Sequence, residues 1–435
     1  MGSWEIYHAI EGPRKRLWGV FFTHVDFQQL ITKLYRLKSE KRRRERYLRL
    51  CTNRPALFRE ARRFFKAVHG VALRAGYPSV YDWVMAVERD PLDWKKLFED
   101  EIFREGLQIY ARQNRAERLK ALQQKRYHVW DHWLVPDQHR HCHACTKKIA
   151  PSFAQSVHIV RCFYAQVGLG HIVREIEFIR RENEHTCARI DYVGKRWLNQ
   201  VLMSEQGAGA EIGTVNYLKT MVHEAGHHVQ ARMIRHPTPS NHLPDGKLVE
   251  VVSMLFEQLF MTSPLLQKLI NDGEVHAHLL TLYQNDVRET LIRMLYHLDM
   301  ELCLYDALKT SSFKANHLAE VNFAKLCAYY GFEGGKLCDH SWLRTLSHYA
   351  YAPFKTRNYV IASVLSQQFF KNYMRATGGK QGTDKANHLL AEKLSLCSAR
   401  GNKNSWKDYS MACGLKKKIS TAFLIDAIGH LIQPR

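Results

Sequence analysis

Two histidines and a glutamate at close spacing are the residues of this sequence best suited to chemistry. His223, Glu224 and His227 lie between Thr214 and Gln230, where apolar residues recur with helical spacing. Histidines four positions apart leave a helix on one side, so their ring nitrogens can hold one Zn²⁺. Glu224 lies beside them, where its carboxylate can take a proton from a metal-bound water. The alternative is a buried helix in which this short pattern occurs by chance.

Gly226 interrupts the same helical stretch, directly before His227. Glycine inside a helix is about 1 kcal/mol less favourable than alanine. A residue that weakens an otherwise strong helix indicates that another element packs closely against it there.

A second apolar stretch, from Lys247 to Phe260, carries a candidate third ligand. Glu250 sits there in a run of valine and leucine, where an isolated carboxylate is unfavourable to bury. A buried acid on an apolar helix soon after the two histidines is the expected form of a third zinc ligand. Ser253 and Glu257 share its helical face. The alternative is a glutamate at the edge of the buried zone that pairs with lysine or arginine.

Composition places the chain among globular proteins. It has 435 residues, of which 46% are hydrophobic. No apolar run reaches the roughly 18–20 residues that a membrane span needs, so no transmembrane segment is expected. The first residues lack the charged and apolar regions of a secretion signal, so we expect a cytoplasmic location. The ten cysteines are scattered, which fits reduced thiols in such a compartment.

Basic residues are in large excess. The formal net charge is +22, and the densest run extends from Lys41 to Arg46. Such a surplus predicts attraction to a polyanion or another acidic partner. The alternative is a solvated helix face, and no recognisable nucleic-acid-binding motif accompanies the charge.

Helical periodicity dominates the chain and predicts a mainly α fold. We expect a basic N-terminal helical region over residues 1–130 and a catalytic region over residues 131–435. Two helical lobes would face each other across a cleft, with a small β-sheet near residues 188–213 beside the metal helix. The expected elements are helices at 24–50, 58–74, 80–87, 94–125, 247–260 and 264–333, strands at 188–196 and 197–203, and further helices from 358 onward.

Cys142 and Cys145 form a Cys-x-x-Cys pair with several histidines around it. A second, structural zinc site is one interpretation of this cluster. The other is a polar loop, because no second cysteine pair or histidine pair follows at zinc-finger spacing.

A later segment combines histidine, tyrosine and two cations. It contains His348, Tyr351, Lys355, Arg357 and Tyr359. This density suggests the lining of a site. Lys355 and Arg357 are candidates for binding a carboxylate group, and arginine suits bidentate capture.

These motifs together resemble the thimet oligopeptidase and oligoendopeptidase F family of zinc metallopeptidases, and most closely its oligoendopeptidase F branch. The likeness covers roughly residues 60–430. The motifs that carry it are His223-Glu224-x-Gly226-His227, Val249-Glu250-x-x-Ser253-x-x-x-Glu257, and His348 with Pro353, Phe354 and Tyr359. The resemblance implies a zincin-like fold and a single Zn²⁺ on His223, His227 and Glu250, with Glu224 as the general base.

The same resemblance implies that His348, with Tyr351 or Tyr359, faces the substrate carbonyl. The sequence departs from the family where tyrosines usually follow Phe354, because Lys355 and Arg357 stand there. The N-terminal part is also shorter than that of many members. The function implied is hydrolysis of peptide bonds in oligopeptides. Lys355 and Arg357 would then bind a peptide carboxylate, so we expect a preference for acidic or C-terminally free peptides. The alternative is a catalytically weak or inactive relative that uses the scaffold as a binding module for acidic partners.

Overall fold

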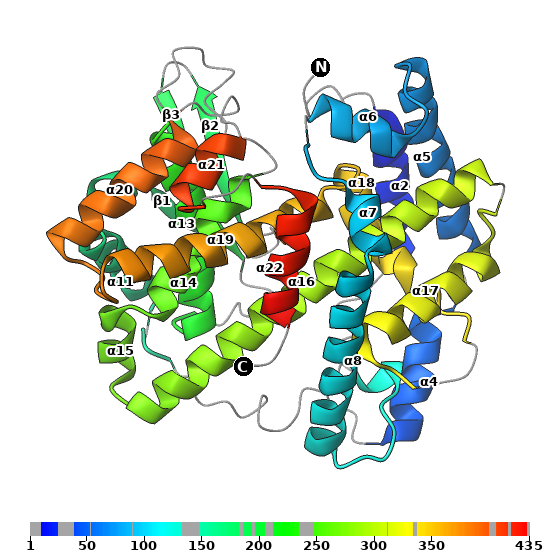
Figure 1. Ribbon diagram of the computed structural model, residues 1–435, viewed down its shortest axis with the longest axis horizontal. Helices are drawn as coiled ribbons and strands as arrows, with labels where there is room; N and C mark the ends of the chain where they lie inside the picture. Colours follow the sequence, from blue (N-terminus) through cyan, green and yellow to red (C-terminus); the bar gives the residue numbers. More distant parts are fainter. Residues whose placement is uncertain are drawn as a thin grey trace. The chain divides into compact units, whose positions relative to one another are not determined.

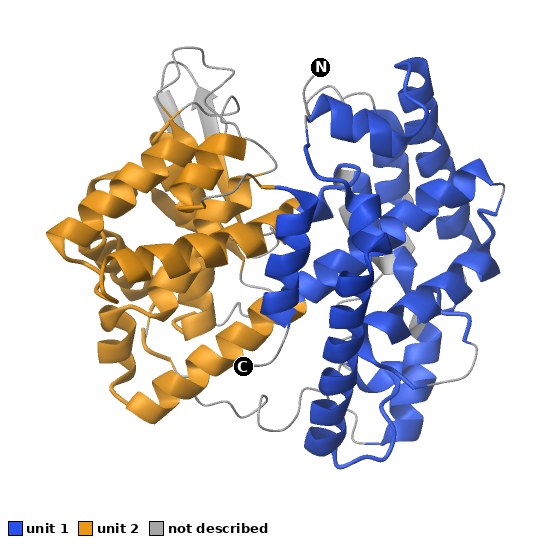
Figure 2. Cartoon of the chain, in the orientation of Figure 1, with its two compact units in different colours: residues 1–140, 290–357, 420–435 blue, residues 141–289, 358–419 orange. Residues whose placement is uncertain are grey.

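Helices make up most of the chain in the computed structural model, as the apolar spacing predicts (Figure 1). The residues that the structure describes are 10–24, 39–52, 54–88, 90–132, 148–150, 152–181, 186–193, 196–204, 212–234, 248–310, 312–333, 337–399, 406–415 and 419–432. They belong to two compact units, coloured separately in Figure 2. Unit 1 comprises residues 1–140, 290–357 and 420–435, and unit 2 comprises residues 141–289 and 358–419. The mainly α fold with a small sheet is confirmed, whereas the division at residue 130 stays a prediction.

The regular elements described in unit 1 are all helices. The ring of Phe65 is central to its core, with centroids 5.2 Å from Tyr305 and 6.3 Å from Tyr349. Its elements are α2 (Glu11–His24), α4 (Glu40–Leu50), α5 (Pro55–Arg74), α6 (Val80–Val87), α7 (Trp94–Glu99), α8 (Glu101–Leu122), η1 (Val129–Asp131), the second half of α16 (Gly273–Lys309), α17 (Ala315–Tyr330), η3 (His340–Thr345), α18 (Leu346–Tyr351) and α22 (Thr421–Ile432).

The helix expected over residues 94–125 is divided in two, which corrects that prediction. Asp100 stands between α7 and α8 with an extended backbone. Its side chain accepts a hydrogen bond from the backbone N–H of Phe103 at 3.1 Å. Aspartate in this position satisfies one of the N–H groups that a helix start leaves without a partner, so it begins a new helix.

The single basic helix expected over residues 24–50 is not continuous, because α4 begins at Glu40 after Ser39, whose backbone is extended. Residues 25–38 lie outside the described part of the chain. Within α4, Arg43 is buried and donates from Nε and Nη2 to Oδ1 of buried Asp131, at 3.0 and 2.8 Å. This ion pair fixes α4 to η1, so Arg43 has a structural role within the basic run.

Unit 2 holds the sheet and the helix with the two histidines. Two aromatic pairs join its helices: Tyr164 and Phe256 with ring centroids 4.9 Å apart, and Phe163 and Phe260 at 5.4 Å. Its elements are α11 (Phe153–Gln166), α12 (Gly170–Val173), β1 (Glu177–Arg181), β2 (Cys187–Val193), β3 (Arg196–Ser204), α13 (Val215–Arg232), α14 (Val249–Met261), α15 (Pro264–Ile270), the first half of α16, α19 (Thr356–Ala376) from residue 358 onward, α20 (Asp384–Ser398) and α21 (Trp406–Ala412).

The described sheet has three strands in the order β1-β3-β2. β2 pairs antiparallel with β3 through Ala188 and Val201, which confirms the two strands expected from the sequence. β1 pairs parallel with β3 and was not expected. His228 of α13 bonds through Nε2 to the carbonyl oxygen of Gln200 in β3 at 2.9 Å. Burial lowers the pKa of His228 to about 4, so a neutral ring holds the helix to the sheet.

Among the described residues, no single helix is both long and apolar enough to cross a membrane. Helices α14 and α15, bent by 47° at the break between them, meet that test of length and composition only as a pair.

Candidate metal site and general base

Helix α13 brings His223, Glu224 and His227 together as the sequence predicts. Thr214 caps its start and accepts a hydrogen bond from the backbone N–H of Tyr217 at 3.3 Å. The apolar face of the helix is buried, whereas His223, Glu224 and His227 are only partly buried. The two histidine rings lie 4.9 Å apart between centroids, nearly perpendicular to each other. The cap and the apolar face therefore set which side of the helix carries the three polar groups.

Gly226 allows α14 to approach α13 closely, as its position in the sequence suggested. A Cβ at residue 226 would lie 2.9 Å from the Cα of Ser253 and 3.2 Å from a ring carbon of Phe256. Side chains do not normally tolerate such short contacts with a backbone atom. The missing Cβ therefore lets the two helices approach until Glu250, one turn before Ser253, reaches the histidines.

Gly226→Ala is accordingly expected to destabilise the protein by about 1–3 kcal/mol, because the added methyl group forces the two helices apart. Urea unfolding measures this change as a lower transition midpoint. Gly429→Ala is the matched control, since a Cβ there meets nothing within 4 Å. That helical substitution is expected to stabilise by up to about 1 kcal/mol. The same gain in Gly226→Ala would contradict close packing at residue 226.

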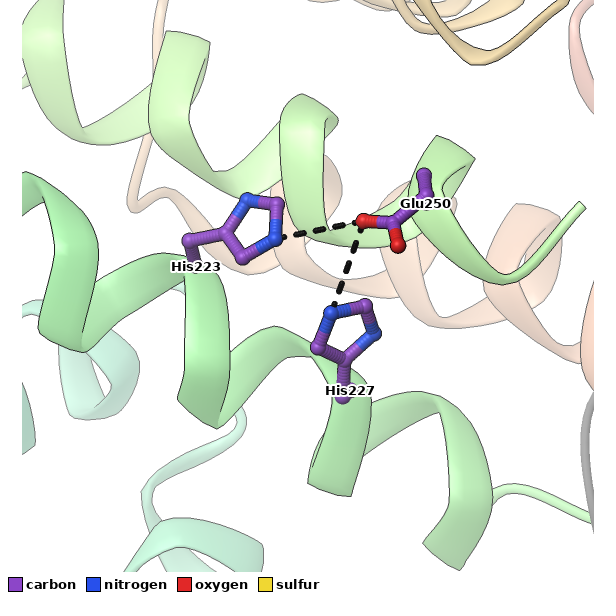
Figure 3. A group of neighbouring side chains, drawn as sticks. All are labelled: His223, His227 and Glu250. Carbon is purple, nitrogen blue, oxygen red and sulfur yellow. Dashed lines mark ion pairs between the residues drawn. The ribbon is translucent and has the colours of Figure 1, made fainter. Parts of the chain in front are cut away.

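Three potential ligand atoms converge between α13 and α14 (Figure 3). Oε2 of Glu250 lies 3.3 Å from Nε2 of His223 and 3.6 Å from Nε2 of His227. Zinc ligands at 2.0–2.2 Å in a tetrahedral arrangement stand about 3.3–3.6 Å from one another. Two imidazoles and one carboxylate are also a ligand set that catalytic zinc sites use. The residues present therefore fit a zinc ion in both spacing and chemistry.

The Nδ1 atoms of the two histidines are held by residues of α14. Nδ1 of His223 lies 2.6 Å from Oε1 of Glu257, and Nδ1 of His227 lies 2.8 Å from Oγ of Ser253. Such partners fix the ring orientation and the tautomer of a metal-binding histidine. Both Nε2 atoms thus point toward Glu250. Ser253 and Glu257 were noted on the face of Glu250 but not predicted as site residues, and their spacing from Glu250 was the available signal.

The site is accessible from solvent rather than sealed. The side chains of His223, His227 and Glu250 keep 19, 13 and 10% of their surface exposed. A structural zinc site is normally closed by a fourth protein ligand, whereas a catalytic one keeps a position open. Within the described residues, only these three form a group suited to a metal. This combination is typical of a catalytic site.

Burial and neighbouring carboxylates shift the titration of the site. Burial lowers the pKa of His223, but Glu250 and Glu257 outweigh it and raise that pKa well above its usual value. Burial raises the pKa of the Glu224 carboxyl. His223 opposes that rise, Glu250 adds to it, and a backbone hydrogen bond from Ala188 in β2 opposes it. A carboxylate with a raised pKa beside a metal site is suited to accept and return a proton.

The two residues predicted to bind substrate, Lys355 and Arg357, differ in burial. Arg357 is 1% exposed, and its guanidinium pairs with Glu88 and with Oδ2 of Asp90, the latter at 2.9 Å. Its Nη1 donates to the carbonyl oxygen of Phe354 at 2.9 Å. These contacts favour a structural role for Arg357 over the predicted role in substrate binding. Lys355 is half-buried, and substrate binding by Lys355 stays a prediction.

The remaining predicted residues belong to different parts of the chain. His348 and Tyr351 are in α18 of unit 1, and their side chains lie outside the described part of the structure. Tyr359 is half-buried in α19, in the part assigned to unit 2, and its carbonyl oxygen accepts a hydrogen bond from Ser363. Their catalytic roles stay predictions. Cys142 and Cys145 lie outside the described residues, so the second zinc site stays a prediction.

The fold is that of the helical zincin-like peptidases. The chain is similar to a structure assigned as oligoendopeptidase F, with a TM-score of 0.66 and 16% identity over 92% of this chain and 69% of that one. PZ peptidase A with an inhibitor gives a TM-score of 0.63 at 16% identity, over 92 and 70%. An M32 carboxypeptidase from Deinococcus radiodurans R1 gives 0.55 at 13%, over 94 and 80%. No family model and no curated protein sequence matches the chain.

At these identities the likeness establishes the fold. It confirms the resemblance to oligoendopeptidase F that the motifs indicated, over almost the whole chain. The similar structures are peptidases of both the endopeptidase and the carboxypeptidase kind.

Proposed function

We propose that this protein is a zinc-dependent peptidase that hydrolyses oligopeptides. His223, His227 and Glu250 would hold a single zinc ion. When bound, zinc supplies Lewis acidity toward a scissile carbonyl and an attacking water. The observation that carries the proposal is the placement of one Glu250 oxygen 3.3 and 3.6 Å from the two imidazole Nε2 atoms.

Other residues of the chain would transfer the proton, orient the histidines, stabilise the oxyanion and bind the peptide. Glu224 follows His223 directly on α13, takes the proton of the attacking water, and returns it to the leaving amine. Glu257 and Ser253 hold the two imidazoles in place through their Nδ1 atoms. His348, with Tyr351 or Tyr359, would donate hydrogen bonds to the developing oxyanion. With Arg357 buried in ion pairs, a preference for acidic or C-terminally free peptides rests on Lys355.

Metal analysis combined with a peptide-library assay tests the proposal. We expect about one zinc per chain, cleavage of short peptides, loss of cleavage after chelation, and recovery when zinc is restored. Mass spectrometry of the products separates endopeptidase from carboxypeptidase cleavage. Bound zinc without turnover on any peptide would favour the inactive binding module. A protein that neither retains zinc nor cleaves peptides would overturn the proposal.

A second proposed activity is binding of a nucleic acid through α4. Lys41, Arg42, Arg44 and Arg49 are exposed on this helix, while Arg43 is buried against Asp131. Exposed cations on a helix that is fixed to the protein body suit contacts with phosphate groups. This activity is independent of the peptidase site.

Binding to a single-stranded oligonucleotide is then expected to weaken as the salt concentration rises. Each phosphate contact that is lost makes the plot of log K against log salt concentration less steep by about 0.7. Replacing Lys41 and Arg42 by Glu together should weaken binding and flatten that slope. Arg43 is left unchanged because its loss would break the ion pair with Asp131. A salt-independent affinity in the wild type would dismiss nucleic-acid binding and leave a solvated helix face.

A further inference from the structure

Phe354, in the turn between α18 and α19, has an unusual backbone. Its φ is +57°, in the left-handed region that non-glycine residues seldom adopt. That conformation costs an L-residue about 1–2 kcal/mol and persists only where its surroundings impose it. The turn follows directly after the segment with His348 and Tyr351 and contains Lys355 next to Phe354. What holds Phe354 therefore also determines the path of that segment.

A buried acid holds the N–H side of Phe354. Glu301 of α16 is fully buried, and its Oε1 accepts a hydrogen bond from the backbone N–H of Phe354 at 2.9 Å. Its Oε2 is buried and has no hydrogen-bond partner within the described part of the chain. Burial raises the pKa of Glu301 well above its usual value, which favours the neutral form of the carboxyl group. Glutamine is accordingly a close isostere that keeps the accepting oxygen.

A buried base holds the carbonyl side of the same residue. Nη1 of Arg357 and the backbone N–H of Arg357 donate to the Phe354 carbonyl oxygen at 2.9 and 3.2 Å. Arg357 is itself fixed by Asp90 and Glu88, and Asp90 also accepts from the indole N–H of Trp94 at 3.1 Å. Both backbone polar groups of Phe354 are thus held by buried side chains: Glu301 from α16, and Arg357, which distant Asp90 and Glu88 fix in place.

The ring of Phe354 adds a third restraint. It is fully buried, with centroids 5.4 Å from the ring of Tyr305 on α16 and 5.7 Å from the ring of Tyr81 on α6. Tyr305 lies one helical turn beyond Glu301 on α16. The same face of α16 therefore contacts both the ring and the N–H of Phe354. The ring and both backbone polar groups of Phe354 are therefore all restrained by buried neighbours.

We propose that Glu301 and Arg357 are positioning residues, which clamp Phe354 from both sides and thereby set the course of residues 348–355. The inference rests on the proposed function, because that segment is expected to contribute oxyanion donors and a peptide-binding lysine. It gives Arg357 an indirect part in catalysis in place of the direct contact expected from the sequence. Neither residue touches the substrate.

The test compares Glu301→Gln and Glu301→Leu in the full chain, with Glu274→Leu at the exposed start of α16 as control. Glu301→Gln keeps the acceptor and is expected to match the wild type. Glu301→Leu removes it and should lower kcat on a short peptide by about 10–100-fold, with little change in KM. Zinc content should be unchanged, because all three ligands are elsewhere. A kcat equal to that of the wild type in Glu301→Leu would overturn the proposal.

Hydrogen exchange at the Phe354 amide gives a readout that does not depend on activity. Exchange should be faster than in the wild type in Glu301→Leu but not in Glu301→Gln. Arg357→Lys is the second test, to be used if Glu301→Leu fails to fold. Lysine lacks the guanidinium group that donates to the Phe354 carbonyl oxygen, so this variant should also lower kcat. If the wild type cleaves no peptide, the proposed function is wrong, and the exchange data alone test whether Glu301 and Arg357 hold Phe354. Equal exchange in all variants would then overturn the positioning role.

Discussion

Glu224→Gln is expected to lower kcat on a peptide substrate by about 10²–10⁴-fold, the usual contribution of a general base. Glutamine preserves the size of the side chain and a hydrogen-bonding oxygen, but it cannot accept the proton of the attacking water. Glu224 is not among the three potential ligands, so bound zinc should stay at the level of the wild type. Steady-state kinetics on one cleaved peptide, with zinc quantified in the same sample, measure both effects.

Glu392→Gln provides a control for the loss of one negative charge in the same unit. Glu392 is exposed on α20 and has no part in the proposed site, so its variant should retain full activity. Equal cleavage by Glu224→Gln and the wild type would remove the proposed mechanism. A loss of zinc in Glu224→Gln would instead assign Glu224 a role in holding the metal.

The metal group was predictable because the determinants within each helix are local. Helical spacing places His223 and His227 on one side of α13, and an acid in an apolar run marks Glu250. Gly226 even carried the information that the two helices meet there, since a Cβ at that position would clash with Ser253. The sequence placed Ser253 and Glu257 on the face of Glu250, but it did not show that they contact the histidines, because those contacts depend on how the two helices pack.

Features that depend on distant partners were harder to predict. Arg357 was expected to face the substrate because it lies in a segment rich in histidine and tyrosine. Its partners Asp90 and Glu88, however, are far away in the sequence, and it is buried against them. β1 was missed because it is short and charged, and only its parallel pairing with β3 makes it a strand. The break before α8, by contrast, had a local signal in Asp100, a good N-cap residue.

Glu250→Gln is expected to weaken zinc binding by more than about 100-fold, because loss of a partner behind a metal ligand already reduces affinity about 10–100-fold. The oxygen of Glu250 that lies between the two Nε2 atoms would become part of a neutral amide, which is a poor zinc ligand. Glu257→Gln is the graded comparison, because Glu257 contacts only Nδ1 of His223 within the group. Competition with a chelator of known affinity measures both constants.

The relative size of the two losses in zinc affinity distinguishes a metal ligand from a residue that orients a histidine. A larger loss of affinity in Glu250→Gln than in Glu257→Gln is expected if Glu250 binds zinc and Glu257 orients a histidine. The reverse order would indicate that Glu257 is the ligand and that His223 binds zinc through Nδ1. The ring of His223 would then have to turn away from Glu250. Unchanged affinity in both variants would exclude α14 from the metal site. The site would then lack a third protein ligand among the described residues, since His223, His227 and Glu250 form the metal-binding group found there.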